Sequence, residues 1–227
     1  FGSGTPTYLI KMLEKFGVNP SEIGPKQAKA SIFDAPTETM TNIAPLLYQS
    51  GYITIKDYNK ILDLYTLDIP NKEVRLGLME SLLPNYVGNA TPEATTMVAY
   101  LFYDIQNGDM DSALRRLQTF LSTIPYSENT KYEGHYQQLF YVIFSLLNYY
   151  VDIEVRTPRG RVDVVLRTKT TLYVMELKLD KTAGEAMEQI NLKNYPERFA
   201  LCGLPVVKVA INFDSERGTI GDWMIEK

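Results

Sequence analysis

The sequence predicts an α/β protein in two parts. The first is a mainly helical region over residues 1–110, and the second is an α-β-β-β-α-β core with a mixed sheet over residues 111–227. Two patterns lead to this prediction. Apolar residues recur at helical spacing through most of the first part, whereas the second part interleaves helical stripes with short β-prone runs. The 227 residues, of which 45% are hydrophobic, also suffice to bury a sizeable core.

In the first part, helical patterns surround one β-hairpin. Helices are predicted over residues 6–16, 43–50, 70–83 and 92–105. Asn71 is a candidate cap for the third of these helices. Residues 18–41 are rich in Pro, Gly, Ser and Thr, which predicts a loop or connector, while 52–56 and 61–67 form the hairpin. This order fits either a winged-helix-like module or a small helical linker domain with an incidental hairpin.

In the second part, two helical stripes precede a series of strands. Helices are predicted over 111–124, 136–147 and 183–193, strands over 151–156, 162–167, 172–179 and 206–213, and an edge strand over 220–225. Turn residues at Pro158-Arg159-Gly160 and Lys169-Thr170 separate the first three strands. The element order is therefore α-β-β-β-α-β.

Charge and composition exclude several classes of protein. No apolar run approaches the roughly 20 residues that span a bilayer, and no basic-then-apolar leader is present, so neither a membrane nor a secreted protein is predicted. The single cysteine excludes an intrachain disulfide, and we expect a cytoplasmic protein. The net charge of −4 counts mildly against DNA binding without excluding a nuclease, because a metal site is itself acidic. The chain opens on Phe1 rather than methionine, so we expect a fragment of a longer protein.

Charged residues interrupt two of the predicted strands. Glu176 and Lys178 lie on the same face of the strand 172–179, together with apolar residues, because side chains alternate along a strand. On the neighbouring strand, Asp163 stands within an otherwise apolar run. Burying such charges is costly unless they are paired or bind a metal. Two carboxylates on adjacent rigid strands therefore predict a site for a hard metal ion.

Two helical residues are predicted to reach the same cleft. Glu133 lies one turn before the inward stripe of its helix, and Gln189 lies one turn after Ala186 on the following helix. A helix carboxylate can add a ligand, and an amide can orient water or phosphate. Each residue alone has a simpler interpretation. Glu133 could complement the helix dipole, Gln189 could be solvated, and Asp163 could pair with Arg161.

Other candidate chemistry is weaker. His135 is the only histidine, which argues against a His-dependent nucleophile relay or a His-rich zinc site. Basic residues cluster around one predicted hairpin, where they could contact phosphates or be solvated. They are Arg156, Arg159, Arg161, Arg167 and Lys169.

Taken together, these motifs resemble the PD-(D/E)xK nuclease superfamily, and more narrowly the nuclease-type domain at the C-terminus of bacterial AAA-ATPase-like proteins. The resemblance extends from Tyr132 to Trp223. The segments that carry it are Tyr132-Glu133, Gly160-Arg161-Val162-Asp163, Glu176-Leu177-Lys178, Ala186-Met187-Glu188-Gln189-Ile190 and Ile211-Asn212-Phe213-Asp214.

The resemblance implies a restriction-endonuclease-like fold and a role for each site residue. Asp163 and Glu176 would bind Mg²⁺ or Mn²⁺, with Glu133 as an accessory acidic residue. Lys178 would position or activate the attacking water, and Gln189 would support the site from its helix. The family often has Pro before the Asp. Val162 stands there in this sequence, a departure that removes no ligand.

The first part is also similar to these AAA-ATPase-like proteins. The matching segments are Gly4-Thr5-Pro6-Thr7, Gln49-Ser50-Gly51-Tyr52-Ile53-Thr54-Ile55 and Pro70-Asn71-Lys72-Glu73-Val74. They look like the end of the ATPase-like region and the stretch that joins it to the nuclease domain. The sequence contains no GxxxxGK[ST] motif, so the ATPase-like domain of such a parent chain is expected to be absent here.

The sequence thus favours a metal-dependent nuclease that acts on nucleic acid, DNA before RNA, with Arg159 and Arg161 as candidate phosphate contacts. A nuclease-fold module that binds nucleic acid or a protein partner without cleavage is the alternative. A third hypothesis concerns the N-terminal half, which would couple an ATPase-like domain to the nuclease by binding protein.

Overall fold

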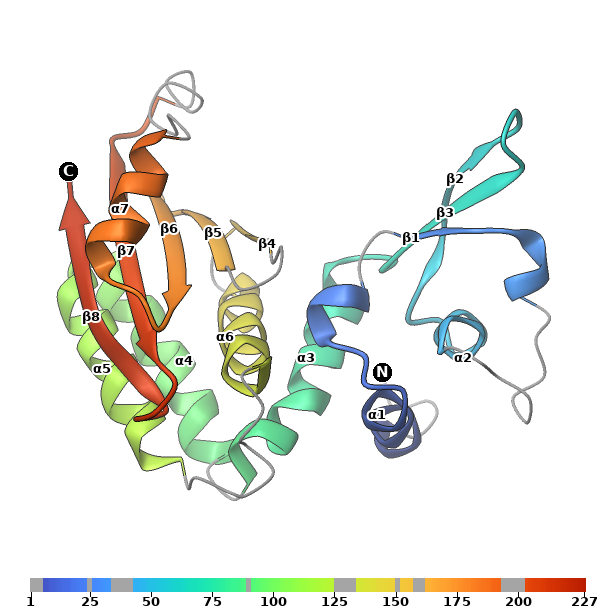
Figure 1. Ribbon diagram of the computed structural model, residues 1–227, viewed down its shortest axis with the longest axis horizontal. Helices are drawn as coiled ribbons and strands as arrows, with labels where there is room; N and C mark the ends of the chain where they lie inside the picture. Colours follow the sequence, from blue (N-terminus) through green and yellow to red (C-terminus); the bar gives the residue numbers. More distant parts are fainter. Residues whose placement is uncertain are drawn as a thin grey trace. The chain divides into compact units, whose positions relative to one another are not determined.

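The structure is a computed structural model, shown in Figure 1. It divides into two compact units, residues 1–82 and 83–227, and the division falls inside one helix, α3 (Lys72–Val87). Pro84 lies within this helix just after the division, and proline removes one backbone hydrogen bond there. The residues described by the structure are 6–23, 26–33, 43–88, 91–124, 134–149, 152–156, 162–192 and 203–227.

The N-terminal unit is built around a three-stranded antiparallel sheet with the strand order β1-β3-β2. Two of these strands form the predicted hairpin, and helices lie before and after β1. The elements are α1 (Pro6–Lys15), η1 (Pro20–Ile23), β1 (Lys26–Ala28), η2 (Ala30–Ile32), α2 (Ala44–Gln49), β2 (Thr54–Asn59) and β3 (Leu64–Asp68).

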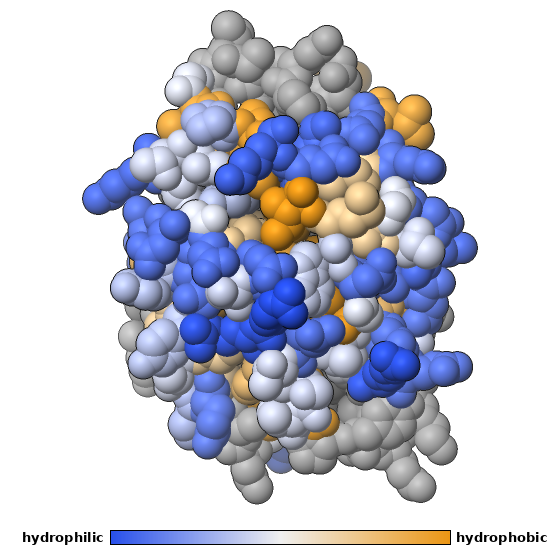
Figure 2. All heavy atoms as spheres, turned by 90° about the vertical axis from the view of Figure 1, so that its left-hand side faces the viewer, coloured by the Kyte–Doolittle hydropathy of each residue, from blue (hydrophilic) through white to orange (hydrophobic). Residues whose placement is uncertain are grey.

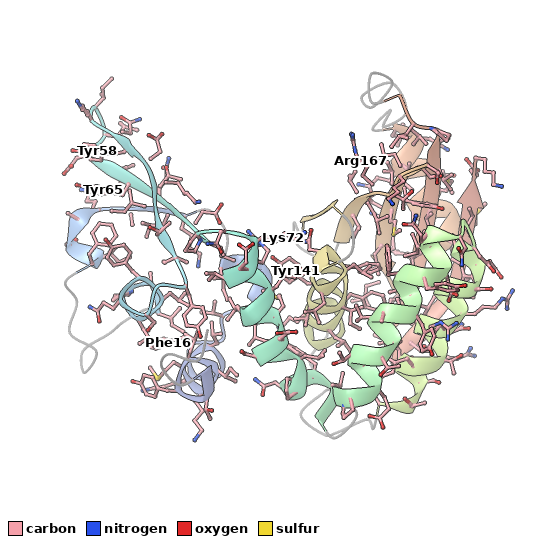
Figure 3. All side chains as sticks on the ribbon, turned by 180° about the vertical axis from the view of Figure 1, so that it is seen from behind. Phe16, Tyr58, Tyr65, Lys72, Tyr141 and Arg167 are labelled. Atoms are coloured by element: carbon pink, nitrogen blue, oxygen red, sulfur yellow. The ribbon has the colours of Figure 1, made fainter. Side chains whose placement is uncertain are left out.

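The prediction of a loop over residues 18–41 was wrong in its first half, because β1 and two short 3₁₀ helices lie there. β1 has only three residues and pairs with β3 through its backbone, with Ala28 opposite Tyr65. So short a strand has no side-chain period to read in the sequence. The hairpin itself carries a stacked pair, Tyr58 and Tyr65, whose ring centroids are 4.5 Å apart (Figure 3).

The C-terminal unit has a five-stranded mixed sheet with the strand order β4-β5-β6-β7-β8. Among the described strands of this unit only β6 and β7 pair in parallel, and β8 is the antiparallel edge strand that the sequence predicted. The predicted α-β-β-β-α-β order is confirmed. The elements are α4 (Thr91–Gln106), α5 (Met110–Thr123), α6 (Gly134–Leu146), η6 (Leu147–Tyr149), β4 (Asp152–Arg156), β5 (Val162–Arg167), β6 (Leu172–Leu179), α7 (Ala183–Leu192), β7 (Val206–Asp214) and β8 (Thr219–Glu226).

Helices cover both faces of this sheet. On one face, Leu172 and Val174 of β6 pack in a buried cluster with Ala186 and Ile190 of α7. On the other face, Phe213 of β7 packs edge-to-face against Phe140 of α6, with ring centroids 5.1 Å apart. Figure 1 shows α4, α5 and α6 on that second side of the sheet. The sheet is therefore the middle of three layers, and α7 alone of the described helices covers the first face.

The unit boundary lies about one helix earlier than the expected boundary at residue 110, because α4 packs within the C-terminal unit. Asp104 of α4 accepts a hydrogen bond from Arg116 Nε of α5 at 2.8 Å. The hydroxyl of Tyr173 on β6 donates to the carbonyl oxygen of Ile105 at 3.4 Å. Both bonds tie α4 to elements that follow it in the chain.

Side-chain caps begin α3 and α5. Asn71 Oδ1 accepts from Val74 N at 2.9 Å, which confirms the predicted cap of α3. Asp109 Oδ1 accepts from Ser112 N at 3.0 Å at the start of α5, and this backbone hydrogen bond lowers the pKa of Asp109. No described helix is long and apolar enough to cross a membrane.

The edge strand β8 is fastened to α5 by polar contacts. Trp223 Nε1 donates to Asp111 Oδ1 at 3.0 Å, and the Arg115 guanidinium lies 5.4 Å from the Trp223 ring centroid. Gln118 Nε2 also donates to the carbonyl oxygen of Ile220 at 2.7 Å. Figure 2 views this side of the molecule and shows mainly hydrophilic side chains around a small hydrophobic area. Such a surface, together with these contacts, protects the edge from pairing with other chains.

Replacing Phe213 by Ala removes the aromatic contact between the sheet and α6, since Phe213 is only 1% exposed. We expect urea denaturation to show a loss of about 3–5 kcal/mol in the free energy of unfolding. Tyr103→Ala, at a position that is 62% exposed, is the control and should change it by no more than about 0.5 kcal/mol. Equal losses in the two variants would contradict this core.

The contact between Asp111 and Trp223 predicts a dependence of stability on pH. Hydrogen bonds from Arg115 and then Trp223 lower the pKa of Asp111 below its ordinary value of 3.8. The stabilisation is therefore present above pH 3.8 and is lost as the pH falls through the lower pKa of the folded state. Asp111→Asn should lower the melting temperature at pH 7, followed by Trp223 fluorescence, and the difference from the wild type should shrink at low pH. Glu216→Gln, an exposed change in the β7–β8 turn, should leave the melting temperature unchanged.

Candidate functional site

The candidate site begins on β6, where a buried strand changes from apolar to charged. Leu172 and Val174 belong to the core beneath α7, and Glu176 and Lys178 continue the same face of the strand. Glu176 is completely buried, and the Lys178 side chain is 15% exposed. The strand thus carries two charges into the layer between the sheet and α7.

Lys178 joins the two elements of this site. Its Nζ lies 3.3 Å from Glu176 Oε1 and donates a hydrogen bond to Gln189 Oε1 on α7. The ammonium is therefore held between a buried carboxylate and an amide oxygen. Together these two partners fix the direction of the ammonium. The structure brings together three of the residues that the sequence predicted for the site.

Asp163 lies next to Glu176 in the sheet. β5 and β6 are antiparallel, and their register places Asp163 directly opposite Glu176. Directly opposed residues belong to the same face of a sheet. The backbone of Asp163 is described, whereas its side chain lies outside the described part of the structure.

The other predicted site residues cannot be placed. Glu133, Arg159 and Arg161 lie outside the described residues, so their roles stay predictions. The basic cluster is not one group, however. Arg167, which is labelled in Figure 3, lies at the opposite end of β5 from Asp163, since it pairs with Leu172 and not with Glu176. The predicted strand 162–167 already implied this separation, because its two ends lie at different turns.

No three potential ligands cluster around a common point among the side chains that the structure describes. Glu133 and the carboxylate of Asp163 lie outside the described part of the structure. The donor set nevertheless suits a hard divalent cation. A buried carboxylate on one strand stands in register with an aspartate on the next, and both are oxygen donors on rigid elements.

No role was predicted for two polar residues beside the site, although Asn212 lies within the segment 211–214 that resembles the nuclease superfamily. Asn212 on β7 is the register partner of Lys178, and Asp222 on β8 is the register partner of Asn212. The signal for Asn212 was available, because it is a polar residue within the apolar run 206–213. Asp222 gave none, since a carboxylate on an edge strand is ordinary.

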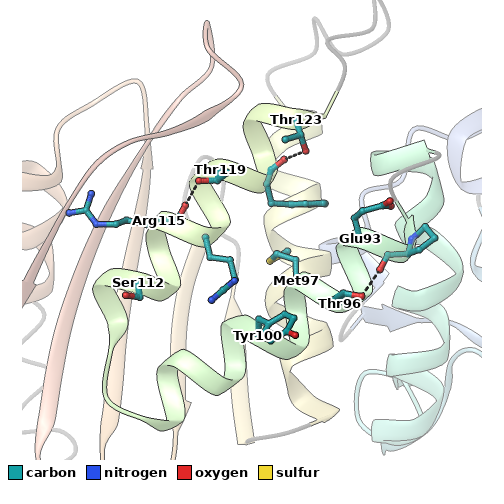
Figure 4. Close-up of a pocket in the computed structure, with 11 residues that line it drawn as sticks. Glu93, Thr96, Met97, Tyr100, Ser112, Arg115, Thr119 and Thr123 are labelled. Atoms are coloured by element: carbon teal, nitrogen blue, oxygen red, sulfur yellow. Dashed lines mark hydrogen bonds between the residues drawn. The ribbon is translucent and has the colours of Figure 1, made fainter.

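A separate cavity of about 770 Å³ lies between α4 and α5 (Figure 4). Its walls include Met97 and Tyr100 of α4 and Phe120 of α5. Arg116 also lines it, but this guanidinium is bound to Asp104 and lies over the Tyr100 ring. The cavity belongs to the helical layer opposite α7 and therefore lies across the sheet from Glu176. The chemistry and the cavity do not coincide, and the charged groups on β6 are the better guide to function.

Comparison with known proteins agrees with this geometry. Residues 131–223 match the model of the PD-(D/E)XK nuclease superfamily. The matched segment contains β4 to β7 and α7, and the mixed α/β architecture agrees with a nuclease-type fold.

A curated relative matches the whole chain. It is an uncharacterised protein from the vnfD 5′ region of Azotobacter chroococcum mcd 1, and it is 30% identical over 244 residues. The alignment covers 100% of this chain and 45% of the relative, so the chain spans somewhat less than half of the relative's length. No solved structure matches the chain.

Lys178→Met should destabilise the protein, because it leaves the buried Glu176 carboxylate without the ammonium beside it. We expect a loss of about 3 kcal/mol in the free energy of unfolding. The double variant Glu176→Gln/Lys178→Met should recover at least about 1 kcal/mol, which a double-mutant cycle in urea measures.

The exposed ion pair between Arg217 and Asp214, at 3.4 Å, supplies the control for this cycle. Arg217→Met should cost less than about 1 kcal/mol, because water already solvates both groups. Additive effects of the two changes at Glu176 and Lys178 would show that the pair is not coupled.

Proposed function

We propose that this protein is a metal-dependent nuclease that hydrolyses phosphodiester bonds in nucleic acid, with DNA as the first candidate substrate. The observation that carries the proposal is the placement of Lys178. Its ammonium lies between the buried Glu176 carboxylate and the Gln189 amide, on the strand next to Asp163. This arrangement falls within the segment that matches the nuclease superfamily.

Asp163 and Glu176 would hold Mg²⁺ or Mn²⁺, with Glu133 as a further ligand. The register of β5 and β6 supports the first two, since it sets both residues on one face of the sheet. When bound, the metal polarises the scissile phosphate and lowers the pKa of an attacking water. The burial of Glu176 excludes bulk water from its carboxylate, which favours a firmly oriented ligand.

Lys178 and Gln189 would act on the phosphate and not on the metal. A fixed ammonium stabilises the negative charge that builds on the phosphoryl oxygens during attack. Gln189 Oε1 accepts a hydrogen bond from one N–H of that ammonium and so limits the directions in which the other two N–H groups can point. Arg159 and Arg161 are candidate contacts to neighbouring phosphates.

The N-terminal unit belongs to a broader part of this proposal. Its sheet order β1-β3-β2, with helices before and after β1, supports a winged-helix-like module. Such a module could join the nuclease to an AAA-ATPase-like domain of the same cytoplasmic parent chain, or could bind protein. The greater length of the relative supports a larger parent.

Cleavage of DNA tests the proposal. The wild type is incubated with single- and double-stranded DNA in Mg²⁺, Mn²⁺ or EDTA, next to Asp163→Asn, Glu176→Gln and Lys178→Met. We expect cutting with either metal and none in EDTA. Each variant should lose at least about a hundredfold in rate, because each removes a group that stabilises developing charge.

Glu226→Gln is the matched control, since it changes a glutamate on β8 away from the site and should leave the rate unchanged. Failure of the wild type to cut any substrate with any metal would contradict the nuclease. A gel-shift assay on the same DNA would then separate a binding module, which retains the shift, from a chain without affinity for DNA.

A further inference from the structure

A row of polar residues continues the candidate site across the sheet. The register pairs Lys178 of β6 with Asn212 of β7, and Asn212 with Asp222 of β8. Register partners occupy the same face, so all three lie on the face that α7 covers. Asn212 is only 8% exposed, and a buried amide needs hydrogen-bond partners.

Those partners connect two strands to the start of α7. Asn212 Nδ2 donates to Asp222 Oδ1 at 2.8 Å, and Asn212 Oδ1 accepts from the backbone N–H of Lys181 at 2.9 Å. The second oxygen of Asp222, Oδ2, accepts from the backbone N–H of Ala183 at 3.1 Å. One amide and one carboxylate thus hold the two N–H groups at the entry to α7.

The local cap of α7 has a different structural role. Thr182 and Glu185 form a capping box, in which Glu185 N donates to Thr182 Oγ1 at 3.1 Å and Thr182 N donates to Glu185 Oε2 at 3.0 Å. Both capping residues are exposed and belong to the helix itself. The box therefore determines where the helix begins in the sequence. The contacts to Asn212 and Asp222 determine where that beginning lies on the sheet.

A β-bulge at Gly221 makes the row possible. Phe213 pairs with Ile220 and Asn212 pairs with Asp222, so Gly221 is an extra residue in β8. Regular alternation would put Ile220 and Asp222 on one face, but the extra residue turns Asp222 towards α7 while Ile220 stays buried on the other side. A Cβ at Gly221 would come within 3.2 Å of Asn212 Nδ2, which favours glycine there.

We propose that Asn212 and Asp222, with the Gly221 bulge, are positioning residues of the site. They fix the start of α7 on the sheet, so that Gln189 reaches Lys178 from a point about 9 Å along the helix axis from Ala183. A site of this kind tolerates displacements of only about 0.5 Å. The effect of this placement on catalysis rests on the proposed nuclease function. The placement of α7 on the sheet does not depend on that function.

Nuclear magnetic resonance of the ¹⁵N-labelled full chain tests the placement without any activity. The side-chain amide signal of Gln189 is identified by its absence in Gln189→Leu. In Asp222→Ala this signal should move to the position of a solvated glutamine. Amide exchange at Lys181 and Ala183 should become about tenfold faster, because each N–H loses its acceptor or that acceptor's support.

A swap of the two residues is the decisive variant. In Asn212→Asp/Asp222→Asn, the new aspartate can accept from Lys181 N and from the new asparagine, whose oxygen can accept from Ala183 N. The swap keeps every hydrogen bond, so the Gln189 signal and the slow exchange should return. Glu226→Gln is the control, because it alters another β7–β8 register pair on the same face, and it should leave the signal in place.

Two results would overturn the inference. One is an unmoved Gln189 signal with unchanged exchange in Asp222→Ala. The other is a swap variant in which β6 amides stay protected while the Gln189 signal is lost, and this decides the question even where Asp222→Ala does not fold. If the protein is a nuclease, Asp222→Ala should lower kcat with little change in KM, and the swap should raise kcat again. If the protein does not cut DNA, the spectra still test whether Asn212 and Asp222 position α7.

Discussion

The parallel pairing of β6 with β7 is the constraint on which the C-terminal unit depends. Parallel neighbours cannot be joined by a tight turn, so the chain must cross over one face of the sheet, here as α7. That crossover buries Leu172 and Val174 and also covers Glu176 and Lys178, which continue the same face. Because α7 lies over the charged end of β6, the candidate site is enclosed between the sheet and a helix.

The charged end of β6 is buried, which is unfavourable unless the charges have partners. The contacts of Glu176 and Lys178 supply those partners. Glu176 has no exposed surface, but Lys178 lies 3.3 Å from it and is itself bound by Gln189. A buried pair of this kind contributes little to stability compared with apolar residues of the same size. The pair therefore supports the proposed nuclease site more than a role in stabilising the fold. Asp163 on the adjacent strand is the register partner of Glu176, and it belongs to the same proposed site.

The edge of the sheet also contributes to the site. β8 is held to α5 through Trp223 and Gln118, and on its opposite face it reaches the start of α7 through Asp222. A single extra residue, Gly221, lets one strand serve both layers. The edge strand β8 thus connects the helical layer to the candidate site. The cavity between α4 and α5 lies away from Glu176 and Lys178.

The sequence by itself determined the α-β-β-β-α-β order and the side of β6 on which Glu176 and Lys178 lie, because strand and helix periods are local properties. It also placed the cap at Asn71. It missed β1, and its expected boundary at residue 110 lies beyond the division inside α3. Only the tertiary structure decided that Gln189 meets Lys178 and that Asn212 and Asp222 hold α7. Those contacts join strands and a helix through register, a crossover and a bulge, and no spacing along one segment encodes them.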